Sequence, residues 1–261
     1  MKNEVKSKKD YFILIKINMS GHNKWSNIQH KKGAADAKKS SIFTKLARHI
    51  SVAAQKGGGD PTMNFSLRLA IEKAKAVNMP KDNIERAIKK GTGEDKDGAV
   101  FQEFLYEGFG PASSAILVET VSDNSNRTIT EVKNIFTKNG GNMGGAGSVK
   151  WQFEQKGVIR FVKEEKDKIN NWEEMQLNLM DGGVEDILET EEGIELYSSK
   201  ENFQKMLETV EKNNIEMIDS GLEWVAKEKI DLSDEDSEKL ANFVEKMEDL
   251  DDVKAVYTNE K

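Results

Sequence analysis

Apolar side chains recur at steps of three and four along residues 42–88, and largely at steps of two within short runs beyond residue 100. The first spacing is typical of amphipathic helices, and the second is typical of strands with one buried face. The change near Gly91 therefore predicts a helical N-terminal unit followed by α+β structure.

The predicted first helix precedes the glycine break at residues 57–59. Its apolar stripe contains Ile42, Leu46 and Ile50, while Lys45 and His49 lie on the neighbouring face. One side of this helix is thus expected to pack and the next to be basic. Two more helices are predicted over residues 64–77 and 80–91.

Residues 92–99 are rich in Gly, Asp and Glu, and we interpret them as a linker. Beyond it the pattern predicts a ββαβ unit and then a βαββαβ unit, which is the ferredoxin-like order. The first unit comprises strands 101–109, 114–121 and 148–153 and helix 128–138. The second comprises strands 158–162, 184–189, 194–198 and 215–225 and helices 172–180 and 200–213.

The C-terminal segment reads as strand 229–232, a helix over 233–249 that Ser233 caps, and strand 253–257. Such a fragment does not make a stable sheet alone, so we expect it to complete the ββαβ unit. The fold class is α+β multidomain: a small N-terminal helical bundle and two α+β domains, one ferredoxin-like and inserted into the other. The predicted domains are residues 20–93, residues 99–155 with 226–261, and residues 156–225; residues 1–19 form an extension that is disordered or precedes the true start at Met19.

The charge distribution changes the functional picture. Residues 20–93 contain 15 Lys and Arg against 5 Asp and Glu, whereas the whole chain has a net charge of −7. Residues 1–93 sum to +13 and the remaining residues to −20. Such a basic segment presents a positive field to a polyanion, and nucleic acid is the obvious candidate partner.

The basic segment supplies candidate phosphate partners, with two side chains suited to stacking or hydrogen bonding. Lys outnumbers Arg, which favours contacts to the backbone over readout of bases. For any single lysine a solvated surface is about as good an interpretation, and Arg86 could pair with Asp82. The candidates are Lys24, Lys31, Lys32, Lys38, Lys39, Lys45, Arg48, Arg68, Lys81, Arg86, Lys89 and Lys90, with Trp25 and His30 as the stacking or hydrogen-bonding groups.

Metal, cofactor and catalytic sites are not expected. The chain has no cysteine, and His22, His30 and His49 match no common zinc spacing. The glycine-rich residues 140–147 lack the lysine and hydroxyl of a phosphate-binding loop, so a helix cap and tight connection is favoured. Glu107, Glu119 and Asp123 are carboxylates that in principle suit Mg²⁺ binding or acid–base catalysis, but no nucleophile or activated partner accompanies them in the sequence.

Other local features have structural explanations. Asn124, Asn126 and Arg127 are expected in a turn that starts a helix, and the acidic run 245–252 in a solvated helix end that keeps nucleic acid away. Trp25 could anchor the N-terminal arm rather than stack on a base. No apolar run approaches the length of a bilayer span, and the lack of cysteine fits the cytoplasm.

Six ordered segments carry a resemblance to a known family: residues 19–28, 78–93, 106–111, 123–128, 139–144 and 250–259. On these segments the chain resembles the YebC family, which includes the mitochondrial translational activator of cytochrome oxidase subunit one. The resemblance covers roughly residues 19–261. It implies a three-domain cytoplasmic protein, described either as a DNA-binding transcriptional regulator or as a ribosome-associated translation factor.

We therefore expect a non-enzymatic nucleic-acid-binding regulator of gene expression, with a DNA-binding transcriptional role first. An RNA- or ribosome-associated role in translation is a close alternative, because the charge argument suits DNA and RNA equally. A protein-interaction adaptor whose basic bundle binds an acidic partner is a third. No membrane or small-molecule partner is expected.

Overall fold

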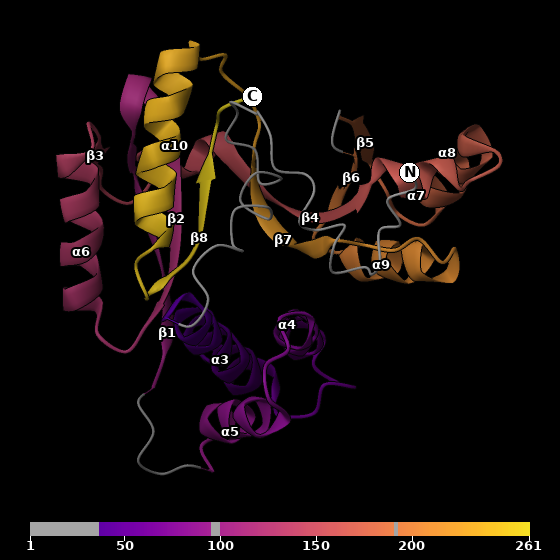
Figure 1. Ribbon diagram of the computed structural model, residues 1–261, viewed down its shortest axis with the longest axis horizontal. Coiled ribbons are helices and arrows are strands. Elements are labelled where there is room, and N and C mark those ends of the chain that lie inside the picture. The colour runs from indigo at the N-terminus through magenta and orange to yellow at the C-terminus, as the bar shows by residue number, and fades with distance from the viewer. Residues whose placement is uncertain (1–36, 95–99, 191–192) are drawn as a thin grey trace, which may run out of the picture.

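The structure is a computed structural model that describes residues 37–94, 100–190 and 193–261 (Figure 1). In the described part, three helices precede the first strand: α3 (Ala37–Gly57), α4 (Phe65–Ala76) and α5 (Lys81–Thr92). They enclose an apolar core of their own, in which Ile50, Leu67 and Ile84 are buried. The predicted helical bundle is confirmed, and we call residues 37–94 the helical unit.

The turn between α3 and α4 is held by Asn64. Its side-chain oxygen accepts the amide of Leu67 at 3.0 Å, which caps α4. Its Nδ2 donates to the carbonyls of Ala53 and Gly58, each at 2.8 Å. One buried amide therefore joins two helices.

The first sheet has the strand order β3-β1-β2-β8, and each pair is antiparallel. The C-terminal strand β8 thus pairs with β2, as the sequence predicted for a tail that completes the first sheet. Helices α6 and α10 pack on one face (Figure 1). The elements are β1 (Gln102–Phe109), β2 (Ala115–Ser122), α6 (Ser125–Lys138), β3 (Asn142–Met143), α10 (Asp234–Glu248) and β8 (Val253–Thr258).

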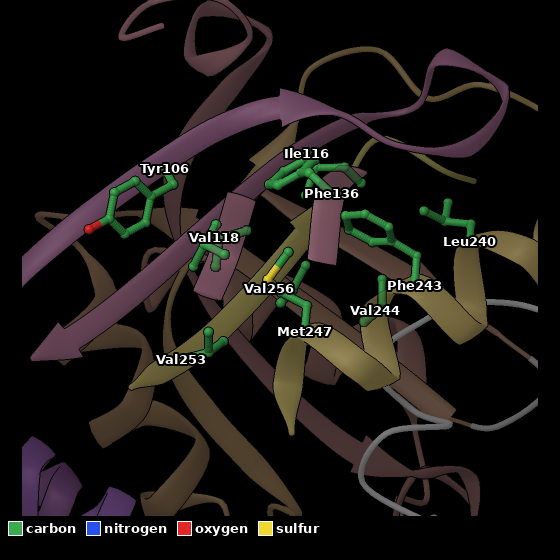
Figure 2. Close-up of a cluster of buried hydrophobic side chains, with 11 residues drawn as sticks. Tyr106, Ile116, Val118, Phe136, Leu240, Phe243, Val244, Met247, Val253 and Val256 are labelled. Carbon is green, nitrogen blue, oxygen red and sulfur yellow. The ribbon is translucent and has the colours of Figure 1, made fainter. Parts of the chain in front are cut away.

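Figure 2 shows the core between this sheet and its helices. Phe136 of α6 meets Phe243 of α10 edge to face, with ring centroids 5.1 Å apart. Ile116 and Val118 of β2 are fully buried beneath them. Alternate residues of β2 serve this core because successive side chains of a strand point to opposite faces.

The second sheet has the order β5-β6-β4-β7 and is antiparallel throughout. Ile159 and Phe161 of β4 share a core with α8 and α9. Arg160, between them, points to the other face and pairs with Glu195 at 3.0 Å and Glu223 at 2.9 Å. The elements are β4 (Phe153–Val162), α7 (Lys163–Asp167), α8 (Trp172–Asp181), β5 (Asp186–Glu189), β6 (Gly193–Ser199), α9 (Phe203–Lys212) and β7 (Asp219–Ala226).

Glu119 of the first sheet ties the two sheets together. Its carboxylate accepts the indole N–H of Trp224 at 3.2 Å and the hydroxyl of Tyr257 at 3.0 Å. Around the contact between Glu119 and Trp224, Leu117 and Phe153 form an apolar cluster on the face opposite α6 and α10. The two sheets are therefore joined by packing as well as by the chain.

The predicted strand at residues 148–153 is wrong. Residues Lys150–Gln152 form a 3-10 turn, and the strand begins at Phe153. The cause is Glu107, whose buried carboxylate accepts the amides of Gly147, Val149 and Lys150 at 2.7 to 2.9 Å. These amides point at one carboxylate and so cannot join a strand ladder.

The predicted gap between strands 148–153 and 158–162 is also wrong, because β4 runs through Gly157 without interruption. Here glycine serves close packing: a Cβ at this position would lie 2.5 Å from the ring of Phe203 and 2.6 Å from the hydroxyl of Ser198. Glycine inside a strand often marks such a close approach.

In the C-terminal segment, Ser233 caps α10 as predicted, accepting the amide of Asp236 at 3.2 Å. The predicted strand at 229–232 is reduced to a single parallel bridge between Ile230 and Glu260. A single bridge is too short to add another strand to the sheet.

Gly157 gives a test of this packing. Replacing Gly157 with Ala should lower the free energy of unfolding by about 1–3 kcal/mol, because Phe203 and Ser198 must move. Gly145→Ala is the control, since no atom lies within 4 Å of its Cβ position. Chemical denaturation of both variants measures the difference; equal midpoints would contradict the tight contact.

Candidate nucleic-acid interface

The predicted phosphate-binding residues fall into two groups. Lys24, Trp25, His30, Lys31 and Lys32 lie outside the described residues. Within the helical unit, Lys38 and Lys39 belong to the first turn of α3, and the others are spread over all three helices. These others are Lys45, Arg48, Arg68, Lys81, Arg86, Lys89 and Lys90.

Two basic side chains of helix α3, Lys45 and Arg48, point at the C-terminal acidic segment. Lys45 donates to the carbonyl of Glu248, and Ser41 donates to the carboxylate of Asp251 at 3.0 Å. Arg48 Nη1 lies 2.6 Å from the carbonyl of Asp251 and 2.7 Å from the carboxylate of Asp252. We call this set of bonds the α3 contact; it joins residues about two hundred positions apart.

Asp252 is the centre of this contact and is 2% exposed. Besides Arg48, its carboxylate accepts bonds from Arg127 at 2.8 Å, Ser122 at 2.8 Å and Thr128 at 2.6 Å. Burial raises the pKa of Asp252, but these hydrogen bonds and the charge of Arg48 outweigh burial and hold the pKa below its usual range. The prediction of a solvated acidic end is therefore wrong at Asp252.

Basic side chains elsewhere on the helical unit also reach the sheets. Lys56 of α3 pairs with Glu103 of β1, and Lys73 of α4 lies 2.9 Å from Asp219 of β7. The ammonium of Lys90 lies 4.4 Å from the ring centroid of Phe101, a cation–π distance. Lys56 and Lys73 were absent from the predicted set, and their helical spacing gave no signal for partners this far along the chain.

His49 lies within this region and is half-buried. Burial lowers its pKa to about 3, and the positive charges of Lys254, Lys73, Lys45 and Arg48 act in the same direction. The imidazole is therefore neutral at physiological pH, and His49 adds no positive charge to the surface.

The outward surface of α4 and α5 carries the remaining cations. Lys81, Arg86 and Lys89 are exposed, and Lys81 pairs with Glu85 at 3.4 Å. Arg68 is half-buried, with its guanidinium 5.2 Å from the ring centroid of Phe65. The exposed surface thus holds separate basic side chains with acidic ones between them.

When basic side chains with a partner outside the helical unit are left out, the net positive charge is larger in residues 20–39 than in residues 40–93. Residues 40–93 contain ten basic side chains, four of which bond to groups outside the helical unit: Lys45, Arg48, Lys56 and Lys73. The other six stand against four acidic side chains, a net charge of +2. Residues 20–39 contain five basic side chains and one acidic, a net charge of +4.

The carboxylates that resembled catalytic or metal-binding groups have structural partners. Glu107 holds backbone amides, Glu119 joins the sheets, and Asp123 pairs with Arg127 at 3.1 Å. Asn124 caps α6 by accepting the amide of Arg127, which confirms the predicted turn. Within the described ranges, no three His, Asp or Glu side chains are grouped so that they could hold a metal ion.

Among the described residues, no helix is both long and apolar enough to cross a bilayer.

Comparison with known proteins identifies the family. Residues 23–94 match the TACO1/YebC protein N-terminal domain, and residues 101–260 match the TACO1/YebC second and third domain. The chain belongs to the TACO1/YebC family. The matched ranges correspond to the helical unit with its preceding basic segment and to the two sheets with their helices.

Relatives of this TACO1/YebC protein have regulatory names. A protein of Caldanaerobacter subterraneus subsp. tengcongensis is 48% identical over 92% of this chain and 98% of its own, and one of Trichlorobacter lovleyi is 47% identical over 92% and 95%. Both are named probable transcriptional regulatory protein. The crystal structure of a conserved hypothetical protein from Aquifex aeolicus superimposes with a TM-score of 0.80 at 38% identity, covering 92% of this chain and 97% of that one.

The neutral state of His49 gives a pH prediction. In the unfolded chain His49 takes up a proton near its ordinary pKa of 6.5, whereas in the folded protein it does not until about 3. The unfolded state therefore binds more protons as the pH falls, and the free energy of unfolding should decrease between pH 6.5 and 5 by up to about 1.4 kcal/mol per pH unit.

The measurement compares urea denaturation of the unaltered protein and His49→Gln across this range, which lies above the titration of most carboxyl groups. The slope should be flatter for His49→Gln. Parallel curves for the two proteins would show that His49 is protonated in the folded state.

Proposed function

We propose that this TACO1/YebC protein is a non-enzymatic, nucleic-acid-binding regulator of gene expression that engages phosphates through residues 20–93. One observation carries the proposal: this segment has a net charge of +10, while the residues after position 93 sum to −20. A polyanion is attracted to one part of the molecule and repelled by the rest.

The proposed contact surface is narrower than the full set of basic residues. Its main part is the segment with the largest charge excess, which contains Lys24, Lys31 and Lys32 and continues into Lys38 and Lys39. The exposed Lys81, Arg86 and Lys89 add a second patch. Trp25 and His30 remain candidates for stacking on bases or bonding to them.

The chemistry of these residues favours backbone binding. Twelve of the fifteen basic residues in the segment are lysines, which act as point charges on phosphates, whereas bidentate recognition of guanine depends mainly on arginine. We therefore expect affinity with little dependence on base sequence.

DNA is the target that the names of the relatives favour, and transcription is the process we propose first. RNA meets the same charge argument, so a translational role is the alternative. The experiment isolates the protein from cell extract treated with DNase or with RNase. A partner that stays bound after DNase but not after RNase treatment would identify RNA as the target, and the reverse would identify DNA. Retention after both treatments would instead support an adaptor for an acidic protein.

We further propose three domains: residues 20–93, residues 99–155 with 226–261, and an inserted ferredoxin-like module at 156–225. The support for the last is its strand order, β5-β6-β4-β7, with α8 and α9 packed on one face. The support for the discontinuous domain is the pairing of β8 with β2. We place the protein in the cytoplasm, with no small-molecule substrate or cofactor.

The dependence of binding on salt tests the proposed surface. Changing Lys24, Lys31, Lys32, Lys38 and Lys39 together to Gln should weaken binding to duplex DNA and to single-stranded RNA of unrelated sequences alike. The slope of log affinity against log salt should flatten by about 0.7–0.9 for each phosphate that the variant no longer binds. Fluorescence anisotropy with labelled oligonucleotides at several salt concentrations measures both quantities.

A control variant makes the same change in net charge on the rest of the molecule. Lys133, Lys138, Lys163, Lys212 and Lys229 are exposed lysines beyond the helical unit. Their replacement by Gln should leave the salt slope unchanged. If both variants changed affinity and slope equally, total charge rather than the basic segment would govern binding.

A further inference from the structure

The α3 contact occupies donors that a nucleic acid would need. The guanidinium of Arg48 points at the carbonyl of Asp251 and the carboxylate of Asp252, and its side chain is 16% exposed. Lys45 is half-buried with its ammonium on the carbonyl of Glu248. A phosphate oxygen cannot reach these groups in this arrangement unless the C-terminal segment moves away.

The segment that occupies them resembles a polyanion in its charge. Residues 245–252 contain five acidic side chains and one basic. Three cations of the helical unit, Lys73, Lys45 and Arg48, act on His49, together with Lys254 of β8. The phosphate oxygens of a nucleic acid accept the same charge-assisted hydrogen bonds from Lys and Arg of α3 as carboxylate oxygens do.

The helical unit has the construction needed to move as a body. It has a core of its own, and its bonds to the first sheet are ion pairs and charge-assisted hydrogen bonds. Salt screens the exposed pair of Lys56 and Glu103, whereas a competing anion must displace the buried carboxylate of Asp252 from Arg48. Apolar contact to the rest of the protein is made by α4, where Phe65 meets Phe203 with ring centroids 5.5 Å apart. That contact joins two uncharged rings, and the candidate phosphate partner Arg68 stacks on one of them, Phe65.

We propose that the α3 contact is an autoinhibitory clasp: nucleic acid and the C-terminal acidic segment compete for α3, and the helical unit makes its full set of phosphate contacts only after α3 is released. This inference rests on the proposed function, and it adds that Lys45, Arg48 and Lys56 bind phosphate in the released state alone.

A covalent lock tests the clasp. The chain has no cysteine, so Lys56→Cys with Glu103→Cys introduces a single reactive pair across α3 and β1, and a short bis-maleimide holds the two elements together. The control is the same variant blocked with a monofunctional maleimide. A second control crosslinks Glu235→Cys and Lys239→Cys within α10, which uses the same reagent and leaves α3 able to move.

The locked protein should bind duplex DNA and single-stranded RNA more weakly than its blocked counterpart. Its salt slope should be smaller by about 1.4–1.8, the value for the two phosphates that Lys45 and Arg48 would bind. The crosslink within α10 should change neither quantity. If locked and blocked proteins bound alike, the clasp would be refuted while the proposed function stood; if the unaltered protein bound no nucleic acid, both would fail.

A pair of charge-matched substitutions gives a second test without crosslinking. Asp251 accepts a bond from Ser41 of α3, whereas the exposed Asp249 lies two residues before it on the same segment. Asp251→Asn should raise affinity about two- to fivefold above that of Asp249→Asn, because it weakens the competitor. Equal affinities for the two variants would contradict competition at α3.

Discussion

The buried carboxylate of Asp252 is the interaction on which the arrangement of the molecule depends. It lies between α10 and β8 and receives hydrogen bonds from α3 through Arg48 and from the start of α6 through Arg127 and Thr128. Removing one partner of a buried ion pair typically costs about 3–5 kcal/mol, because the remaining charge stays buried. The carboxylate thus holds the C-terminal segment against the first sheet, and it holds the helical unit against the C-terminal segment.

This arrangement decides which cations are available. The helical unit has basic side chains on several faces, but those facing the sheets are matched with carboxylates and carbonyls of the acidic body. The field presented to a polyanion then comes mainly from residues 20–39 and from the outer surface of α4 and α5. Because the rest of the protein is strongly acidic, a nucleic acid is attracted to these basic residues and repelled by the two sheets with their helices.

Local features of the fold could be predicted from the sequence, because their causes are local. Asn124 and Ser233 cap helices through bonds to amides three residues ahead, and the apolar stripe of α3 is visible as a spacing. Long-range causes were missed. Nothing near residues 148–153 indicates that Glu107 holds their amides, and nothing near Gly157 indicates the ring of Phe203.

The candidate interface, too, could be predicted from the sequence only in part. Composition located the basic segment, but the helical period of Lys45 and Arg48 cannot show whether a cation faces solvent or a carboxylate about two hundred residues away. Crosslinking of nucleic acid to the full-length protein in cells, followed by mass spectrometry of the modified peptides, tests the central claim most directly. Nucleotide adducts should lie on peptides from residues 20–93; adducts confined to residues 101–261 would contradict the basic segment as the binding site.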